Sequence, residues 1–267
     1  MPEAVTEHWD LQARAEQLEA SGRHVGGPPE HYAREGRLQL IALLRRGLNP
    51  DSHVVDVGCG CLRAGYWLIH FLEPGRYHGI DPMKDNLDAA RAAILEPGLE
   101  ASRQPGFAYN ADFDIGVFGV APAFVLARSI WSHAPKSQIQ ALLDSFAASA
   151  ADDALLLSSY LPAKDRDDRP VVRRSRLDRL LRPKPARLRG NASNHPDYMG
   201  TDWAGWGPGS DARGVLIAHS FDWIADECRQ RALVVHESRE DRFGGQVWLE
   251  IRRDGSASRR VAVAREA

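Results

Sequence analysis

The chain has 267 residues, of which 43% are hydrophobic and 26% are charged, and its formal net charge is −2. This length and apolar content suffice for one sizeable core rather than two, and the small net charge does not favour binding to a polyanion by bulk electrostatics. Three cysteines are too few for a disulfide framework and fit a reducing compartment.

The first fifty residues are predicted to form an N-terminal helical cap, residues 1–50. Helices are expected at 7–20 and 30–47, separated by the breaker Gly26-Gly27-Pro28-Pro29. The N-terminus lacks the basic and apolar regions of a signal peptide, and no apolar run reaches ~18 residues. We therefore expect a cytoplasmic protein without a membrane partner.

Residues 51–159 alternate between short apolar runs and helical patterns. Alternating units of this length predict an α/β fold with a doubly wound, mainly parallel sheet and helices on both faces. The predicted strands are 53–57, 77–81, 106–109, 123–127 and 154–159, and the predicted helices are 62–72, 84–95 and 135–150.

The first predicted strand ends in a glycine-rich turn, Val54-Val55-Asp56-Val57-Gly58-Cys59-Gly60-Cys61-Leu62. Gly58 and Gly60 have no Cβ, so this turn lets backbone N–H groups approach a ligand closely. The dinucleotide fingerprint G-x-G-x-x-G fits less well, because its third glycine would fall on Arg63. Cys59 and Cys61 have no second Cys or His cluster at zinc spacing, so no metal is expected.

Carboxylates follow the next two predicted strands. Asp81, followed by Pro82, ends the second strand, where an acid in nucleotide-binding α/β folds accepts hydrogen bonds from both ribose hydroxyls. The alternative for Asp81 is a surface turn before proline. The third strand leads into Asp112-Phe113, and Asp114 is a rival because a one-residue slip changes which carboxylate points inward.

The fourth predicted strand runs into the turn Arg128-Ser129-Ile130-Trp131-Ser132-His133. Open α/β folds bind substrates at this carboxyl edge of the sheet. His133 is therefore a candidate general base, since the ordinary pKa of histidine lies near neutrality. The alternative is that His133 caps the following helix or bonds to the backbone.

Together these motifs resemble the class I S-adenosylmethionine (SAM)-dependent methyltransferases of the small-molecule type. The glycine turn is similar to their motif I, acidic-x-Gly-x-Gly-x-Gly, with Leu62 in place of the third glycine, and Ser129-x-Trp131-x-His133 is similar to the pattern after their fourth strand. The resemblance covers about residues 30–160 and 215–252. It implies SAM as the cofactor and a seven-stranded sheet whose last strand is antiparallel.

The resemblance also implies particular cofactor contacts. An aromatic residue of the second helix, here Tyr32, lies near the methionine end of SAM, while Asp112 takes the adenine amino group and Phe113 lines the ring. The cofactor-binding residues expected are Tyr32, Asp56, Gly58, Cys59, Gly60, Asp81, Pro82, Asp112, Phe113, Arg128 and Ser129.

A helix at 219–231 and strands at 232–237 and 246–251 are predicted to complete the core, over residues 216–252. The closing pair of strands resembles the β-hairpin ending of methyltransferases, which a nicotinamide-binding Rossmann domain lacks. Residues 253–267, rich in Ser, Arg and Ala, are expected to be a disordered tail.

Residues 160–215 are predicted to be an inserted substrate lid. Residues 163–190 carry eleven Lys or Arg against four Asp, which makes this part +7 while the rest of the chain is −9. A solvated helix, a docking face for an acidic carrier or nucleic acid, and a dimer contact stay open. The loop that follows contains aromatic residues, and its His195 and Tyr198 are further catalytic candidates.

The sequence thus favours a SAM-dependent methyltransferase acting on a small-molecule acceptor, most readily at oxygen. Its Ala/Arg-rich composition is typical of high-GC bacteria, in which many such enzymes modify secondary metabolites. Alternatives are a carrier-bound, glycan or nucleic-acid acceptor, a SAM-binding protein that does not methylate, and a nicotinamide-dependent oxidoreductase. The acceptor, the methylated atom and the oligomeric state, a homodimer included, stay open.

Overall fold

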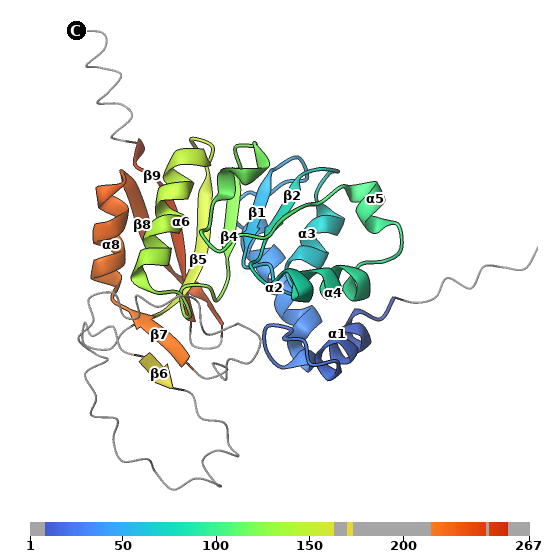
Figure 1. Ribbon diagram of the computed structural model, residues 1–267. Coiled ribbons are helices and arrows are strands. Elements are labelled where there is room, and N and C mark those ends of the chain that lie inside the picture. The colour runs from blue at the N-terminus through green and yellow to red at the C-terminus, as the bar shows by residue number, and fades with distance from the viewer. Residues whose placement is uncertain (1–8, 163–169, 173–214, 244–245, 256–267) are drawn as a thin grey trace, which may run out of the picture. The chain divides into compact units, whose positions relative to one another are not determined.

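The computed structural model describes residues 9–162, 170–172, 215–243 and 246–255 (Figure 1). The chain divides into two compact units, residues 1–110 and residues 111–267. Among the described residues, none of the helices combines the length and the apolar character that crossing a bilayer requires.

The first unit contains three parallel strands in the order β3-β2-β1. The register pairs Val54 with Tyr77 and His78 with Gly106. Every residue of β1 and β2 is buried, as expected for parallel strands covered on both faces. The elements of this unit are α1 (Leu11–Ala20), η1 (Pro29–His31), α2 (Tyr32–Leu44), β1 (Val54–Val57), α3 (Gly65–Phe71), β2 (Tyr77–Ile80), α4 (Lys84–Ile94), α5 (Leu99–Arg103) and β3 (Gly106–Ala108).

The two N-terminal helices form where the sequence predicts them, with shorter ends. The carboxylate of Asp10 caps α1 by accepting hydrogen bonds from the first-turn N–H groups. The buried residues of α1 are Leu11, Ala15 and Leu18, and α1 packs against α4. Helix α5 was not predicted from the sequence.

In the second unit, β4 and β5 are parallel, and β9 pairs antiparallel with β5 and with β8. Helix α8 packs on β8 and contacts α6. The α/β fold class, mainly parallel with an antiparallel last strand, is thereby confirmed. The elements are η2 (Ile115–Phe118), β4 (Phe124–Ala127), α6 (Lys136–Ser149), β5 (Leu155–Pro162), β6 (Pro170–Val172), β7 (Val215–His219), α8 (Phe221–Gln230), β8 (Leu233–Phe243) and β9 (Gln246–Arg253).

Strands β6 and β7 are additions that the sequence did not predict. Strand β7 runs parallel to the last residues of β5, where Pro162 pairs with His219, and β6 pairs antiparallel with β7 (Figure 1). Residues 163–169 and 173–214, which hold most of the predicted lid, lie outside the described residues, as does the predicted tail from residue 256.

Candidate functional site

The glycine turn after β1 is held against the end of β2 by backbone hydrogen bonds. The N–H groups of Gly58 and Cys59 both donate to the carbonyl of Ile80, at 2.7 and 3.0 Å. Gly58 and Gly60 have φ values of 70° and 52°, in the left-handed region where a side chain is strained. The path of the backbone therefore favours glycine at both positions, and neither glycine places a Cβ atom in the turn.

Leu62 occupies the third glycine position of the motif and keeps a glycine-like backbone. Its φ is 61°, and its side chain is fully buried. A left-handed conformation costs a non-glycine residue about 1–2 kcal/mol, and burying a leucine side chain contributes about 1.5–3 kcal/mol. Burial therefore offsets the strain. Helix α3 consequently begins at Gly65, three residues later than the sequence predicts.

Asp81 links the glycine turn to the start of α4. Its Oδ2 accepts a hydrogen bond from the N–H of Gly60 at 2.9 Å, and its Oδ1 accepts one from the N–H of Met83 at 2.8 Å. Burial raises the pKa of this carboxyl, while the two N–H groups act in the opposite direction. Each carboxylate oxygen has two acceptor lone pairs, so Asp81 keeps the capacity to accept further hydrogen bonds, as a ribose would require. Pro82, beside it, is half-buried.

Asp56 is a second buried carboxyl next to this turn. It accepts a hydrogen bond from the hydroxyl of Tyr77 at 3.0 Å. Burial raises the pKa of Asp56 to about 7, the Tyr77 hydrogen bond lowers it, and the charge of Asp81 raises it. Asp56 therefore titrates near neutrality, and a cation bound nearby would favour its carboxylate form. The sequence pattern predicted Asp56 as a site residue but did not predict the raised pKa of its carboxyl.

The segment after α1 and the first residue of α2 contact the glycine turn, or the residue that follows it, at three points. The buried hydroxyl of Tyr32 donates to the carbonyl of Cys61, and the thiol of Cys61 donates to the carbonyl of His24. The Nη1 of Arg63 donates to the carbonyl of Gly26 at 2.6 Å. A Cβ on Gly26 would lie 3.2 Å from the guanidinium carbon, so the glycine allows this approach. In the sequence this glycine signals only a helix break, so these contacts are visible only in the structure.

Cys59 and Cys61 are buried free thiols. A Cβ on Gly79 would come within 2.9 Å of the Cys59 Sγ, and the amide of Asn86 donates to the Cys61 Sγ at 3.2 Å. Burial raises the pKa of both thiols, that of Cys61 to about 12, so both stay protonated and pack as small apolar groups. Within the described residues, no group of three or more His, Cys, Asp or Glu side chains is arranged to hold a metal ion.

In the second unit, Asp112 and Asp114 are both exposed, but they accept different hydrogen bonds. Asp114 caps η2, its Oδ1 accepting a hydrogen bond from the N–H of Gly116 at 2.8 Å. Asp112 is exposed, and its Oδ1 lies 3.4 Å from the backbone nitrogen of Asp114. Between them Phe113 is buried, with a left-handed φ of 58°. The capping role of Asp114 favours Asp112 as the carboxylate that meets a ligand.

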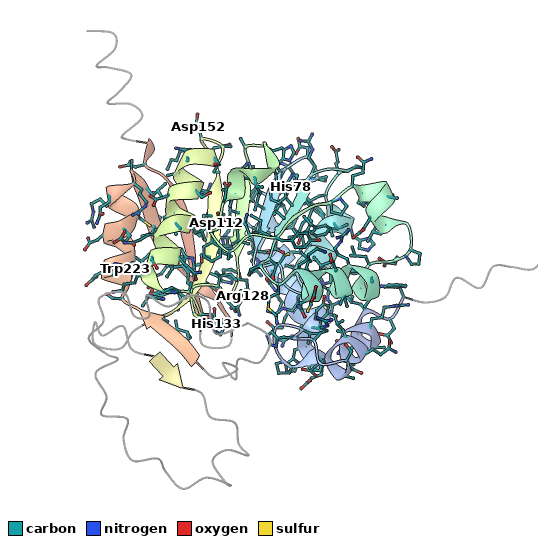
Figure 2. The ribbon with its side chains drawn as sticks, viewed as in Figure 1. His78, Asp112, Arg128, His133, Asp152 and Trp223 are labelled. Carbon is teal, nitrogen blue, oxygen red and sulfur yellow. The ribbon has the colours of Figure 1, made fainter. Side chains whose placement is uncertain are left out.

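A polar network lies at the carboxyl end of β4 (Figure 2). The Nη1 of Arg128 donates to the hydroxyls of Ser129 and Ser159 and to the amide oxygen of Gln246, the last at 2.7 Å. The Nε2 of Gln246 donates to the Ser129 Oγ at 3.0 Å, and the N–H of Ser129 donates to the Ser159 Oγ at 2.9 Å. Sequence reasoning identified Arg128 and Ser129 and missed the other two, which strand pairing brings to them.

His133 lies in the turn that follows this network (Figure 2). Its N–H donates to the carbonyl of Ile130 at 2.9 Å, and its side chain is half-buried. The same turn is held by His219, a buried residue at the end of β7, whose Nε2 lies 2.9 Å from the carbonyl oxygen of Trp131. Since a carbonyl can only accept, this Nε2 carries the proton. The ring of His219 also stacks on Trp223, and sequence reasoning did not identify it.

The remaining predicted catalytic residues, His195 and Tyr198, lie outside the described residues, as does most of the basic segment 163–190. Their roles stay predictions.

Comparison with solved structures finds this fold in SAM-dependent methyltransferases. Magnesium protoporphyrin IX methyltransferase (ChlM) from Synechocystis PCC 6803, with bound S-adenosylhomocysteine (SAH), matches with a TM-score of 0.53 and 18% identity over 90% of this chain and 93% of that chain. The glycopeptide N-methyltransferase MtfA complexed with SAM matches with a TM-score of 0.53 and 10% identity over 82% and 94%. The DhpI–SAH complex matches with a TM-score of 0.51 and 13% identity over 92% and 94%. No protein-family model and no curated protein matches the sequence.

The chain therefore has the fold of the class I SAM-dependent methyltransferases. The antiparallel pairing of β9 with β5 and β8 is the hairpin ending that the sequence predicted and that a nicotinamide-binding Rossmann domain lacks. At 10–18% identity the likeness establishes the fold, while the reaction has to be argued from the site residues.

Proposed function

We propose that this protein is a SAM-dependent methyltransferase that transfers a methyl group to a small-molecule acceptor, at oxygen. The observation that carries the proposal is the glycine turn, in which Gly58 and Gly60 are left-handed and the N–H of Gly60 donates to the buried carboxylate of Asp81. The proposal is supported by the fold, which is shared with enzymes solved in complex with SAM or SAH. We place the enzyme in the cytoplasm, where its buried thiols would stay reduced.

The residues around the turn fit such a cofactor. The turn carries no Cβ at Gly58 or Gly60, so its backbone can approach the methionine part of the ligand. Asp81 is proposed to accept hydrogen bonds from the ribose hydroxyls, and Asp112 to accept one from the adenine amino group. Two buried carboxyls with raised pKa values, Asp56 and Asp81, would both be stabilised as carboxylates by a cationic ligand.

SAM supplies a methyl group on a sulfonium, which is already an activated leaving group. The chain has to hold the acceptor in line with this methyl group and exclude water. An alcohol or phenol must also lose its proton, and His133 is the proposed base, at the carboxyl end of the strands. The hydrogen bond from His219 to the Trp131 carbonyl would fix the turn that carries His133.

Isothermal titration calorimetry with SAM, SAH and NAD⁺ tests the cofactor. We expect SAM and SAH to bind and NAD⁺ not to bind. Asp81→Ala should weaken SAM binding by about 1.5–3 kcal/mol, the range for hydrogen bonds to a charged group. The matched control is Asp85→Ala, since Asp85 is exposed in the first turn of α4. Preferential NAD⁺ binding, or a change below about threefold in a folded Asp81→Ala variant, would contradict the assignment.

The reaction is tested by measuring SAH release with a panel of phenols, alcohols, amines and carbon acids. His133→Ala should lower turnover on an oxygen acceptor by ~10²-fold with little change in SAM affinity. An equal loss of SAM affinity would place His133 in the cofactor pocket instead. Unchanged turnover would mean that His133 has only a structural role in the turn before α6. SAM binding without any methylated product would favour a SAM-binding protein of another activity.

A further inference from the structure

One half-buried cation lies directly after the glycine turn. Arg63 follows Leu62, and the Nη1 of its guanidinium donates to the carbonyl of Gly26 at 2.6 Å. This is the one hydrogen bond that the Arg63 side chain makes with the described residues, although a guanidinium carries five N–H donors. Its Nε and Nη2 are not among the buried side-chain atoms that lack a partner, so they are open to solvent. The Nε–Nη2 edge is therefore accessible to a ligand.

The orientation of this guanidinium is fixed by a glycine of the facing segment. A Cβ on Gly26 would lie 3.2 Å from the guanidinium carbon of Arg63 and 3.4 Å from its Nη1 and Nη2, so a side chain at this position would press on the guanidinium. Gly22 has a similar φ, 85° against 82° at Gly26, but a Cβ on Gly22 would meet nothing within 4 Å. Gly26 therefore serves the contact with Arg63 as well as the turn of the backbone.

Two carboxylates act on this guanidinium without forming an ion pair with it. Burial lowers the pKa of Arg63, and the charges of Glu35 and Asp56 raise it. Within the described part of the chain, the ion pair of Glu35 is with Arg34, at 3.6 Å, and Asp56 accepts a hydrogen bond from Tyr77. A half-buried charge interacts more strongly with an opposite charge than one surrounded by water does. The site thus offers a ligand one positive group with negative groups near it.

Arg63 lies in the same unit as the glycine turn and close to it in the chain. Cys61, two residues before Arg63, accepts a hydrogen bond from the Tyr32 hydroxyl at its carbonyl, and its thiol donates to the carbonyl of His24. These contacts hold the segment after α1 against the turn, entirely within the first unit. Arg63 is three residues from Gly60, whose backbone is proposed to approach the methionine part of SAM.

We propose that Arg63 binds the α-carboxylate of SAM through the Nε–Nη2 edge of its guanidinium. The planar edge of a guanidinium matches a carboxylate with two parallel hydrogen bonds. The carboxylates near Arg63 favour a ligand that carries an ammonium as well as a carboxylate, as the amino-acid part of SAM does, over a simple anion. The inference deepens the proposed function and rests on it, because it assigns the residue that holds one group of the proposed cofactor.

Two variants of Arg63 and a matched control test this contact. Arg63→Met removes the charge at similar length, and Arg63→Lys keeps the charge but removes the planar edge. Arg103→Met is the control, because Arg103 is also half-buried in the first unit and its Nη1 also donates to a backbone carbonyl, that of Leu72 at 3.2 Å. Circular dichroism and thermal denaturation establish that each variant is folded.

Calorimetry compares the binding of SAM with that of decarboxylated SAM. Wild type should bind SAM about 10- to 100-fold more tightly than the decarboxylated analogue, because the analogue lacks the group that Arg63 holds. Arg63→Met should bind both compounds with similar affinity. Arg63→Lys should show an intermediate preference, and Arg103→Met should show the preference of wild type.

Two glycine variants test the orientation of the guanidinium with Arg63 itself in place. Gly26→Ala should press a methyl group on the guanidinium and reduce the preference for SAM. Gly22→Ala introduces a similar backbone strain without a neighbour, so it should keep the preference of wild type. Glu35→Gln should also keep that preference, because Arg63 is proposed to act on the ligand and not through Glu35.

The inference is overturned if wild type binds SAM and decarboxylated SAM equally, or if Arg63→Met keeps the preference of wild type. It is also overturned if Arg103→Met or Glu35→Gln loses the preference as Arg63→Met does. Should Arg63→Met not fold, equal losses in Gly26→Ala and Gly22→Ala would overturn it. In each of these cases wild type still binds SAM, so the proposed function stands. Failure of wild type to bind SAM or SAH would overturn the proposed function and this inference together.

Discussion

Asp56→Asn should stabilise the ligand-free protein at neutral and alkaline pH. The Asp56 side chain is buried, and burial raises its pKa from 3.8 to about 7. A carboxyl whose pKa is higher in the folded than in the unfolded protein binds its proton more tightly in the folded state. Its contribution to stability is therefore greatest below pH 4 and is lost as the pH rises through 7. A shift of about three units corresponds to about 4 kcal/mol.

Urea denaturation of wild type and Asp56→Asn between pH 5 and pH 8 measures this effect. The amide is uncharged throughout, so the variant should gain stability relative to wild type by about 2.5 kcal/mol over that range. Asp85→Asn, at an exposed position, should show no such pH-dependent gain. A difference in stability between wild type and Asp56→Asn that stays constant from pH 5 to pH 8 would contradict this prediction, because the carboxyl would then not titrate in that range.

The same titration should couple to the cofactor. SAM carries positive charge, which favours the carboxylate form of Asp56, so binding near pH 6.5 should release a proton. Calorimetry in buffers of different ionisation enthalpy measures that proton, and Asp56→Asn should release none from this position. The SAM affinity of wild type should rise as the pH increases through 7. The SAM affinity of Asp56→Asn should be lower and should depend less on pH.

Three further predictions concern single contacts. Gly58→Val should nearly abolish SAM binding in calorimetry, because φ at Gly58 is 70° and a branched side chain would occupy the ligand side of the turn. Circular dichroism should still report a folded sheet. SAM affinity equal to that of wild type would contradict this prediction. His219→Phe keeps an aromatic ring but loses the hydrogen bond to the Trp131 carbonyl, so its turnover should fall. His219→Gln, whose amide can still donate, should retain more turnover. An equal loss of turnover in both variants would leave His219 with only a packing role. Asp112→Ala should weaken SAM binding. Asp114→Ala should lower stability by about 1 kcal/mol, because the cap of η2 is lost, and should leave SAM affinity unchanged. The reverse pattern would exchange the roles of the two carboxylates.

The central strands could be predicted from the sequence almost to the residue. Strands predicted at 53–57 and 123–127 are observed at Val54–Val57 and Phe124–Ala127. These runs are short, apolar and rich in β-branched or large side chains, and turn-forming residues bound them, so local signals suffice. The glycine turn and Asp81 were predictable for the same reason, since each follows directly from such a strand.

The contacts that support the site were not predictable in this way. Arg63 bonds to Gly26 across 37 positions, and Arg128 bonds to Gln246 across 118. Nothing local marks these partners, because neither a glycine in a loop nor a glutamine at the start of a strand signals a contact with a distant residue. The contact of Arg128 with Gln246 arises from the register of β9 on β5, which is set by the burial of whole strands. The contact of Arg63 with Gly26 arises where the segment after α1 packs against the glycine turn.

This difference has a physical basis that also explains Leu62. The motif predicts a third glycine because the backbone there turns left-handed, and the structure keeps that turn with a leucine whose burial offsets the strain. The conformation, and not the residue type, is what the turn requires. A sequence pattern reports the usual solution to such a requirement, whereas packing can supply another. Departures from the motif therefore weaken the functional prediction less when the structure shows that the same backbone path is preserved.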